Sequence, residues 1–358
     1  MNKIKVETTN NPYEVVVGSN LINQNNLEAL KDKEVLLVID ENIPSKYKDI
    51  ITEELSNLSS NFHTLEICAS EENKSWITLD KIHSKLIEER YSRDCFLLGL
   101  GGGITCDITG FAAATYQRGV KFILFPSTLL SQVDASVGGK TAINHPEGKN
   151  MIGAFHQPLK VFADVDLLGS LPEIEISNGL SEVIKHALIK DKKYFDWLEI
   201  NMENIISLQP DVLEHAIARS IEIKAEIVSE DEKENGIRKI LNFGHTFGHA
   251  IEVYGKFKEF SHGQSVAIGM LMAMELSKIE ERFPQEDLNR AKELINVANP
   301  NISQVYTFDD KQLFENMSVD KKRSGNQLIF IVLSEIGKAN IKSDIKESAI
   351  TKAIQSLV

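Results

Sequence analysis

The sequence predicts an α/β amino-terminal domain with a parallel, Rossmann-like sheet, followed by a mostly α-helical carboxyl-terminal domain. Its 358 residues are enough for two domains with separate cores. Before residue 170, short apolar runs alternate with amphipathic segments, which is typical of a parallel sheet covered by helices on both faces. After that point helical periodicity dominates. We therefore place the domains at residues 1–170 and 171–358.

The elements of the first domain follow from its apolar runs. Residues 3–8 and 13–17 flank an Asn-Asn-Pro turn and predict an opening hairpin. Residues 76–91 carry apolar side chains at helical spacing and predict an amphipathic helix. Buried parallel strands are predicted at 34–39, 62–68, 94–100, 121–125 and 160–163.

The second domain reads as a series of helices separated by turns or charged breaks. A short pair of strands, 327–333 and 339–342, is expected near its end. The helices are predicted at 174–189, 194–208, 210–230, 241–254, 264–282 and 285–298.

Composition narrows the function classes. The net charge of −13 argues against a nucleic-acid partner, because neutralising phosphates needs a basic face, but it allows a small anionic substrate where cations gather locally. No apolar run approaches the length of about 20 residues that spans a bilayer, and the start lacks the apolar core of a signal peptide. Three cysteines without paired spacing, Cys68, Cys95 and Cys106, suit a reducing cytosol. We expect a cytoplasmic protein without a membrane partner.

A glycine turn follows the strand predicted at 94–100. It reads Gly101-Gly102-Gly103-Ile104-Thr105-Cys106-Asp107 and leads into a helix, so that bare backbone N–H groups at a helix start can receive a phosphate. Ile104 stands where the usual dinucleotide fingerprint has its last glycine. The turn favours a nucleotide pyrophosphate over a merely tight structural turn. Asp40 and Asn42, after an earlier strand, either hold ribose hydroxyls or form a generic turn.

Several cations lie in glycine-rich, apolar surroundings. Lys140 and Lys149 each follow glycine, and Arg118 precedes one. Glu182 and Lys185 stand three apart, on one face of a predicted helix. Any single one of these lysines is equally well a surface residue, but their joint placement favours binding of a phosphate or carboxylate.

Three of the nine histidines fall close together, at His245, His249 and His262. Neutral imidazole is the commonest protein ligand for zinc-like metals, so such a cluster predicts a metal or proton-transfer site. His245 and His249 are four apart and share one helix face, which by spacing alone nominates both as ligands. Ordinary core or surface histidines are the alternative.

These motifs together are recognisable. The chain resembles the 3-dehydroquinate synthase family of the sugar-phosphate cyclase superfamily, most specifically between residues 99 and 270. The match to residues 71–75 and to Asp320-Lys321-Lys322 is looser, and the sequence does not decide which of these two lysines contacts substrate. The resemblance rests on the glycine turn, on His262-Gly263, and on the blocks 114–119, 126–134, 138–141, 148–155, 179–185 and 242–250.

The resemblance implies a dehydroquinate synthase-like fold and a lyase of the shikimate pathway, which leads to chorismate and the aromatic amino acids. The enzyme would convert 3-deoxy-arabino-heptulosonate 7-phosphate into 3-dehydroquinate and phosphate. It would use NAD catalytically, taking a hydride and returning it in one turnover, together with a divalent metal, zinc or cobalt. The first domain would bind NAD and the second the metal and substrate. A homodimer is implied, with Arg118 reaching the partner's site.

The resemblance also implies the site residues. The metal ligands would be Glu182, His245 and His262, whereas His249 would lie beside the substrate phosphate. The remaining catalytic and substrate-binding residues would be Arg118, Lys140, Lys149, Asn150, Lys185, Lys224, Arg238 and Asn242. The cofactor would contact Asp40, Asn42, Glu71, Lys74, Gly102, Gly103, Ile104, Thr105, Cys106, Asp107, Ser127, Thr128, Asp134, Lys140 and Lys149.

Two departures from the family pattern stand out. Cys106 replaces the usual glycine before Asp107, and Ser127 replaces the usual threonine. A side chain larger than glycine at position 106 can crowd the pyrophosphate and weaken NAD binding, whereas a small residue is expected to be tolerated. Neither change removes a catalytic group. The alternatives are another sugar-phosphate cyclase, a metal-dependent polyol dehydrogenase of similar architecture, or a catalytically inactive binding protein. An inactive protein would be expected to have lost a ligand or a lysine, and all are present.

Overall fold

The computed structural model describes residues 1–358 except 10, 304–307, 325–327 and 357–358. The chain divides into two compact units. One comprises Met1–Pro172 and Leu213–Lys233, and the other comprises Glu173–Val212 and Glu234–Val358. None of the described helices has the length and hydrophobicity that a bilayer crossing needs.

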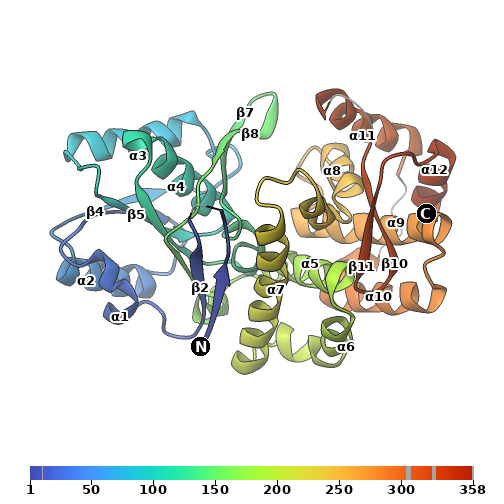
Figure 1. Ribbon diagram of the computed structural model, residues 1–358, viewed down its shortest axis with the longest axis horizontal. Helices are drawn as coiled ribbons and strands as arrows, with labels where there is room; N and C mark the ends of the chain where they lie inside the picture. The colour runs from blue at the N-terminus through green and yellow to red at the C-terminus, as the bar shows by residue number, and fades with distance from the viewer. Residues whose placement is uncertain (10, 304–307, 325–327, 357–358) are drawn as a thin grey trace. The chain divides into compact units, whose positions relative to one another are not determined.

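A seven-stranded sheet forms the first unit, in the order β1-β2-β9-β6-β5-β3-β4 (Figure 1). Every neighbouring pair is parallel except β1 with β2, which form the predicted opening hairpin at one edge. The predicted parallel sheet is therefore confirmed. Its strands are β1 (Asn2–Val6), β2 (Tyr13–Gly18), β3 (Glu34–Asp40), β4 (Asn61–Ile67), β5 (Phe96–Gly101), β6 (Lys121–Pro126) and β9 (Lys160–Asp164).

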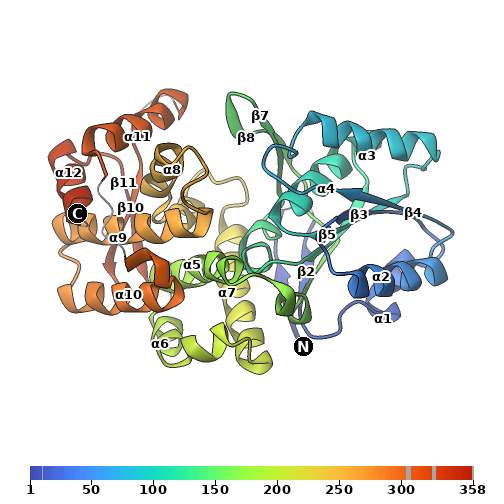
Figure 2. The same ribbon diagram turned by 180° about the vertical axis from the view of Figure 1, so that it is seen from behind.

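Helices cover both faces of this sheet (Figures 1 and 2). The short α1 (Gln24–Leu27), η1 (Glu28–Leu30) and α2 (Ser45–Leu58) lie on one face, and α3 (Trp76–Glu88) and α4 (Gly103–Thr115) lie on the other. Alternate residues of the central strands join α2 in one buried apolar cluster. On the opposite face Gly99 lets α4 approach, since a Cβ there would lie 3.0 Å from Thr109 Oγ1.

The strand order reverses between β3 and β5. The chain leaves β3 for β4 on one side and then returns to β5 on the other, and Ile39 of β3 pairs with Leu100 of β5. In open parallel sheets, ligands bind at the carboxyl ends of the strands flanking such a reversal. Asp40 and Gly101 end these two strands. The topology thus brings the predicted ribose and pyrophosphate residues to one edge.

The glycine-rich segment after β6 forms structure that the periodicity did not predict. Following η3 (Ser131–Ala135), strands β7 (Lys140–His145) and β8 (Gly148–Phe155) pair as an antiparallel hairpin, which projects from the first unit in Figure 1. The unit also contains η2 (Tyr116–Arg118), η4 (Val165–Ser170) and, from Leu213 onward, helix α7 (Pro210–Glu230). Residues 213–233 thus pack with the α/β unit although they follow the start of the helical half.

The second unit is built around α9 (His262–Glu281), which is buried along most of its length. The predicted mostly helical character is confirmed. The β pair was expected from residue 327, but Leu328 and Ile329 are not in a strand and β10 starts at Phe330, while Gln327 lies outside the described residues. The other elements are α5 (Glu173–Lys190), α6 (Lys192–Ile206), η5 (Ile237–Asn242), α8 (His245–Tyr254), α10 (Gln285–Ala298), η6 (Pro300–Ser303), α11 (Asp310–Ser324), β10 (Phe330–Glu335), β11 (Lys338–Lys342) and α12 (Glu347–Gln355). The helices α11 and α12 were not predicted.

Candidate active site

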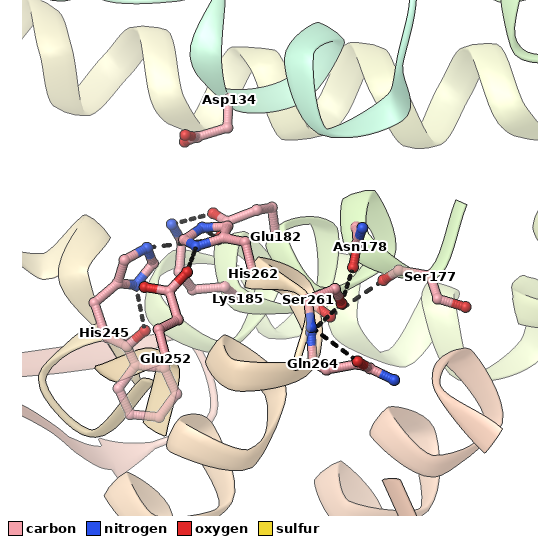
Figure 3. Close-up of polar contacts among 12 residues, drawn as sticks. Asp134, Ser177, Asn178, Glu182, Lys185, His245, Glu252, Ser261, His262 and Gln264 are labelled. Atoms are coloured by element: carbon pink, nitrogen blue, oxygen red, sulfur yellow. Dashed lines mark hydrogen bonds and ion pairs between the residues drawn. The ribbon is translucent and has the colours of Figure 1, made fainter. Parts of the chain in front are cut away.

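Three side chains from three helices of the second unit converge on one point (Figure 3). Glu182 lies on α5, His245 at the first position of α8 and His262 at the first position of α9. The Nε2 atoms of His245 and His262 lie 3.6 Å and 4.0 Å from Glu182 Oε1. One ligand atom from each residue falls within 4.8 Å of the others, so the three residues form a group that could hold one metal ion.

The chemistry of this group fits a divalent metal. Glu182 is fully buried, and its Oε1 accepts no hydrogen bond from the residues that the structure describes. An isolated buried carboxylate oxygen is costly unless a cation compensates it, and Lys185 is ion-paired with the other oxygen, Oε2. Burial, followed by the charges of Lys185, His249 and His262, lowers the pKa of His245 well below its usual value. The imidazole of His245 is therefore neutral, as a metal ligand must be.

A capped helix start fixes His262. Ser261 and Gln264 form a reciprocal capping box, so α9 begins at His262. The Ser261 hydroxyl donates to Asn178 Oδ1 at 2.5 Å, and Asn178 stands one turn before Glu182 on α5. Gly263 permits this contact, because a Cβ there would lie 2.3 Å from Asn178 Cα. The start of α9 is thus held against the first half of α5, beside the cluster.

His245 is held by close packing of α8 on α9. Gly244 caps α8 with a left-handed φ of +79°, a conformation that favours glycine. The two helices approach so closely that a Cβ on Gly248 would lie 3.0 Å from Ser265 O, and one on Gly269 would lie 2.1 Å from Gly244 O. His245 Nδ1 also lies 3.2 Å from Phe243 O, which leaves Nε2 to face Glu182.

We expect Gly269→Ala to lower the free energy of unfolding by about 1–3 kcal/mol or more, because overpacking forces backbone shifts. The new methyl group would meet the backbone of Gly244, which cannot move without displacing His245. Urea denaturation of the two variants and the wild type measures this. Gly169→Ala is the matched control, since a Cβ there meets nothing within 4 Å. Equal stability of both variants would contradict the close packing of α8 on α9.

The other residues predicted in this unit differ in their burial. Lys185 and Arg238 are buried, whereas His249 is exposed on α8 with its ring 5.5 Å from that of His245. His249 does not belong to the three-residue set, so the spacing-based nomination of this residue as a ligand is not the arrangement the structure favours. Asn242 donates to Glu234 Oε1 at 2.7 Å. The sequence reasoning missed Glu234, whose only signal is a place in an acidic stretch beside Arg238.

In the first unit, the glycine turn exposes backbone at its start and buries the side chains of Thr105 and Cys106. Gly102, Gly103 and Ile104 are partly exposed at the start of α4, where helix N–H groups are unpaired. Thr105 and Cys106 are buried, and the Cys106 thiol donates to Gly101 O at 3.7 Å. The side chain of Cys106 thus faces the interior, which removes the geometric reason for expecting it to crowd a bound pyrophosphate.

The neighbouring strand end supports this turn through its backbone. Ser127 is buried after β6, and its N–H donates to Gly101 O at 2.9 Å. Thr128 follows, and its methyl group would lie 3.3 Å from a Cβ at Gly102. The backbone bond from residue 127 does not depend on the methyl group that a threonine would add. After β3, Asp40 Oδ1 accepts from both the N–H and the side-chain amide of Asn42 at 3.0 Å.

A buried lysine joins the turn to the β7–β8 hairpin. Lys74 is ion-paired with Asp107 of α4, and its Nζ donates to Asn150 Oδ1 at 2.6 Å. Burial raises the pKa of Asp107, and the charge of Lys74 opposes that rise. Nearby, Glu71 lies 3.7 Å from Lys149 Nζ. Residues predicted to contact the cofactor thus touch the hairpin that carries residues predicted to contact the substrate.

The remaining predicted residues of the first unit occupy different settings. Lys224, buried on α7, lies 2.6 Å from Asp134 Oδ1. Lys140 is exposed at the start of β7. Arg118 is exposed after α4 in a left-handed conformation, with φ +69°. The side chains of Lys321 and Lys322, in α11, lie outside the described residues.

Comparison with known families shows to which family of enzymes this chain belongs. Residues 64–178 match the family described as 3-dehydroquinate synthase N-terminal, and residues 179–323 match 3-dehydroquinate synthase C-terminal. The chain belongs to the 3-dehydroquinate synthase family. It is therefore an enzyme, a lyase acting on a phosphate-containing substrate, as the sequence motifs predicted.

Curated relatives cover the whole chain. A 3-dehydroquinate synthase from Acidithiobacillus ferrooxidans is 42% identical over 100% of this chain and 99% of its own length. One from Haemophilus ducreyi is 41% identical over 99% of each chain. The resemblance that the motifs indicated between residues 99 and 270 thus extends to both ends.

Solved structures of related cyclases share the fold. A 2-epi-5-epi-valiolone synthase from Streptomyces hygroscopicus, with NAD+ and Zn2+ bound, is 26% identical and superposes with a TM-score of 0.89 over 98% of this chain and 97% of its own. A 2-deoxy-scyllo-inosose synthase complexed with carbaglucose-6-phosphate, NAD+ and Co2+ gives a TM-score of 0.90 at 24% identity over 99% and 100% of the two chains. An NADH-dependent butanol dehydrogenase from Thermotoga maritima shares the fold at a TM-score of 0.68 and 14% identity over 98% and 99% of the chains.

Proposed function

We propose that this enzyme converts 3-deoxy-arabino-heptulosonate 7-phosphate into 3-dehydroquinate and inorganic phosphate, using NAD catalytically and a divalent metal, zinc or cobalt. The observation that carries the proposal is the convergence of Glu182, His245 and His262 in a chain 42% identical to a 3-dehydroquinate synthase along its whole length. Two imidazoles and one carboxylate leave a coordination position for substrate, as a catalytic zinc site requires. When bound, the metal would supply Lewis-acid polarisation of a substrate oxygen.

We assign the substrate's anionic groups to the cations around these sites. Lys185 and Arg238 are buried, so their charges are little screened and would act strongly on a bound anion. Lys224 is buried as well and lies against Asp134. Neutral donors come from Asn150 and Asn242, while His249, exposed one turn after His245, would contact the phosphate. Lys140 and Lys149, on the hairpin, complete the set of cations.

We assign NAD to the edge formed by the carboxyl ends of β3, β5 and β6. Bound NAD would supply a hydride acceptor that returns the hydride within the same turnover. The partly exposed turn at Gly102 and Gly103 would receive the pyrophosphate on helix N–H groups. The neighbouring residues assigned to the cofactor are Asp40, Asn42, Glu71, Lys74, Ile104, Thr105, Cys106, Asp107, Ser127, Thr128, Asp134, Lys140 and Lys149. The domain assignment of NAD to residues 1–170 and of metal and substrate to 171–358 is part of this proposal.

The proposal includes a cytoplasmic homodimer in the shikimate pathway. Arg118 is exposed in a left-handed turn at the end of α4, a position from which a guanidinium can reach another chain. Supporting this, the cations assigned to phosphate suit a small sugar phosphate, and the net charge of −13 argues against a nucleic-acid partner.

The NADH yield distinguishes this proposal from a polyol dehydrogenase of the same fold. With substrate in large excess, NADH absorbance is expected to stay at or below the enzyme concentration while phosphate accumulates, because the hydride is returned in each turnover. Parallel measurements of absorbance and free phosphate test this, with a chelator-treated sample as control. NADH formed in proportion to turnover would establish the dehydrogenase instead.

A further inference from the structure

A carboxylate outside the three-ligand set faces one of its histidines. Glu252 Oε1, on α8, lies 3.2 Å from His262 Nδ1 (Figure 3). Glu252 is buried, with 8% of its surface exposed. A buried carboxylate is retained only where donors or cations compensate it, so this contact is part of what keeps Glu252 inside the unit.

The contact fixes the chemical form of His262. A carboxylate accepts at Nδ1, so the proton of the neutral ring lies there and the lone pair lies on Nε2. Nε2 is the atom that points toward Glu182 Oε1, at 4.0 Å. The bond to Glu252 therefore selects both the tautomer and the ring rotation that a ligand at Nε2 needs.

Helix α8 carries both a ligand and this carboxylate. His245, His249 and Glu252 occupy positions i, i+4 and i+7 of α8, which place them on one face of a helix. Phe257 N–H donates to Glu252 O at 2.7 Å and anchors the end of the helix. Because Gly248 and Gly269 lock α8 against α9, the distance between Glu252 and His262 is set by the same packing that sets His245.

We propose that Glu252 is a positioning residue of the metal site, which accepts the Nδ1–H of His262 and orients that ring for metal binding. The inference rests on the proposed metal set of Glu182, His245 and His262. Partners of this kind, one step removed from the metal, typically contribute about 10–100-fold to metal affinity.

Two substitutions separate orientation from simple packing. Glu252→Leu removes the acceptor and keeps most of the volume, whereas Glu252→Gln keeps an acceptor oxygen at the same reach without the charge. We expect Glu252→Leu to raise the zinc dissociation constant of the full-length apoprotein about 10–100-fold, and Glu252→Gln to raise it by less. Competition with a chromogenic chelator measures the affinity, and the visible spectrum of the Co2+-loaded protein reports the ligand geometry.

Glu275→Leu is the matched control. Glu275 lies in the same unit on α9 and pairs with Lys278 at 3.0 Å, away from the imidazoles. Its loss should leave zinc affinity and the cobalt spectrum unchanged. Urea unfolding in the presence of chelator checks that each variant folds. Should Glu252→Leu fail to fold, Glu252→Asp, which withdraws the acceptor by one methylene, is expected to weaken zinc binding more than Glu252→Gln.

The outcomes are decisive in both directions. Wild-type zinc affinity in folded Glu252→Leu would overturn the proposal, and so would a Glu252→Gln variant no better than Glu252→Leu. His262→Ala identifies where a failure lies. If His262→Ala also keeps full affinity, the proposed ligand set is wrong; if His262→Ala loses the metal while Glu252→Leu keeps it, only the positioning role is wrong.

Discussion

His262→Ala is expected to abolish tight metal binding and to lower turnover by about 10³-fold or more, while the second unit stays folded. Losing one of three ligands removes Lewis-acid stabilisation worth several kcal/mol, and about 4 kcal/mol corresponds to that loss of rate. The fold should survive because His262 is partly exposed at the first position of α9. The capping box of Ser261 and Gln264, which starts the helix, does not involve the imidazole.

Elemental analysis after dialysis, together with phosphate release from the substrate, measures the two effects. His215→Ala is the matched control, because His215 is an exposed histidine of α7 in the other unit. It should retain both metal and activity. Full metal occupancy in folded His262→Ala would refute the assignment of Glu182, His245 and His262 as the ligand set.

Sequence periodicity predicted the fold where apolar residues are regularly spaced. The parallel strands and the helices α5, α7 and α10 were found within a few residues, because each buries a continuous apolar stripe or run. The helix α2 was missed although Tyr47, Ile51 and Leu55 recur every four residues, a signal that could have found it. The β7–β8 hairpin was missed because it is rich in glycine and exposes most of β8.

The candidate site shows a different limit of sequence reasoning. Helical spacing indicated His249 together with His245, because a spacing argument relates only residues of the same helix. The metal set instead joins the starts of α8 and α9 to Glu182 on α5, and no local period relates Glu182 to residues so far along the chain. Glu252 lies three residues beyond His249 on the same face, but a single glutamate on a helix carries no signal until its burial against His262 is known.

Contacts between distant segments could be predicted least. Lys74 matched the family only loosely, yet in the structure it bridges Asp107 of α4 and Asn150 of the hairpin. Such a bridge depends on the fold of the whole first unit and not on any pattern near residue 74. The family resemblance indicated these residues one by one, whereas the structure shows that Lys74 contacts both Asp107 and Asn150.

Mixing two inactive variants is expected to restore activity if Arg118 serves the neighbouring chain. Arg118→Ala and Lys140→Ala should each lower the catalytic efficiency by about 2–5 kcal/mol, or roughly 30- to 5,000-fold, because each removes a charge that we propose to contact the substrate anion. Arg118 is exposed after α4, whereas Lys140 begins the hairpin of its own unit. In a mixed dimer, one site would have both cations restored and the other would lack both. Equal mixing with full exchange gives about half mixed dimers, so about one quarter of the wild-type rate should return.

The pair Lys140→Ala and Lys149→Ala provides the control. Both lysines belong to the same hairpin of one chain, so every site of their mixed dimer lacks one of them and no activity should return. Subunit exchange is demonstrated separately, by a tagged chain that carries its untagged partner through purification. If exchange occurs and the Arg118→Ala and Lys140→Ala mixture stays at the parental background, Arg118 acts within its own chain or not at all. Recovery in the first mixture alone would place the guanidinium in the neighbouring site and make the dimer the catalytic unit.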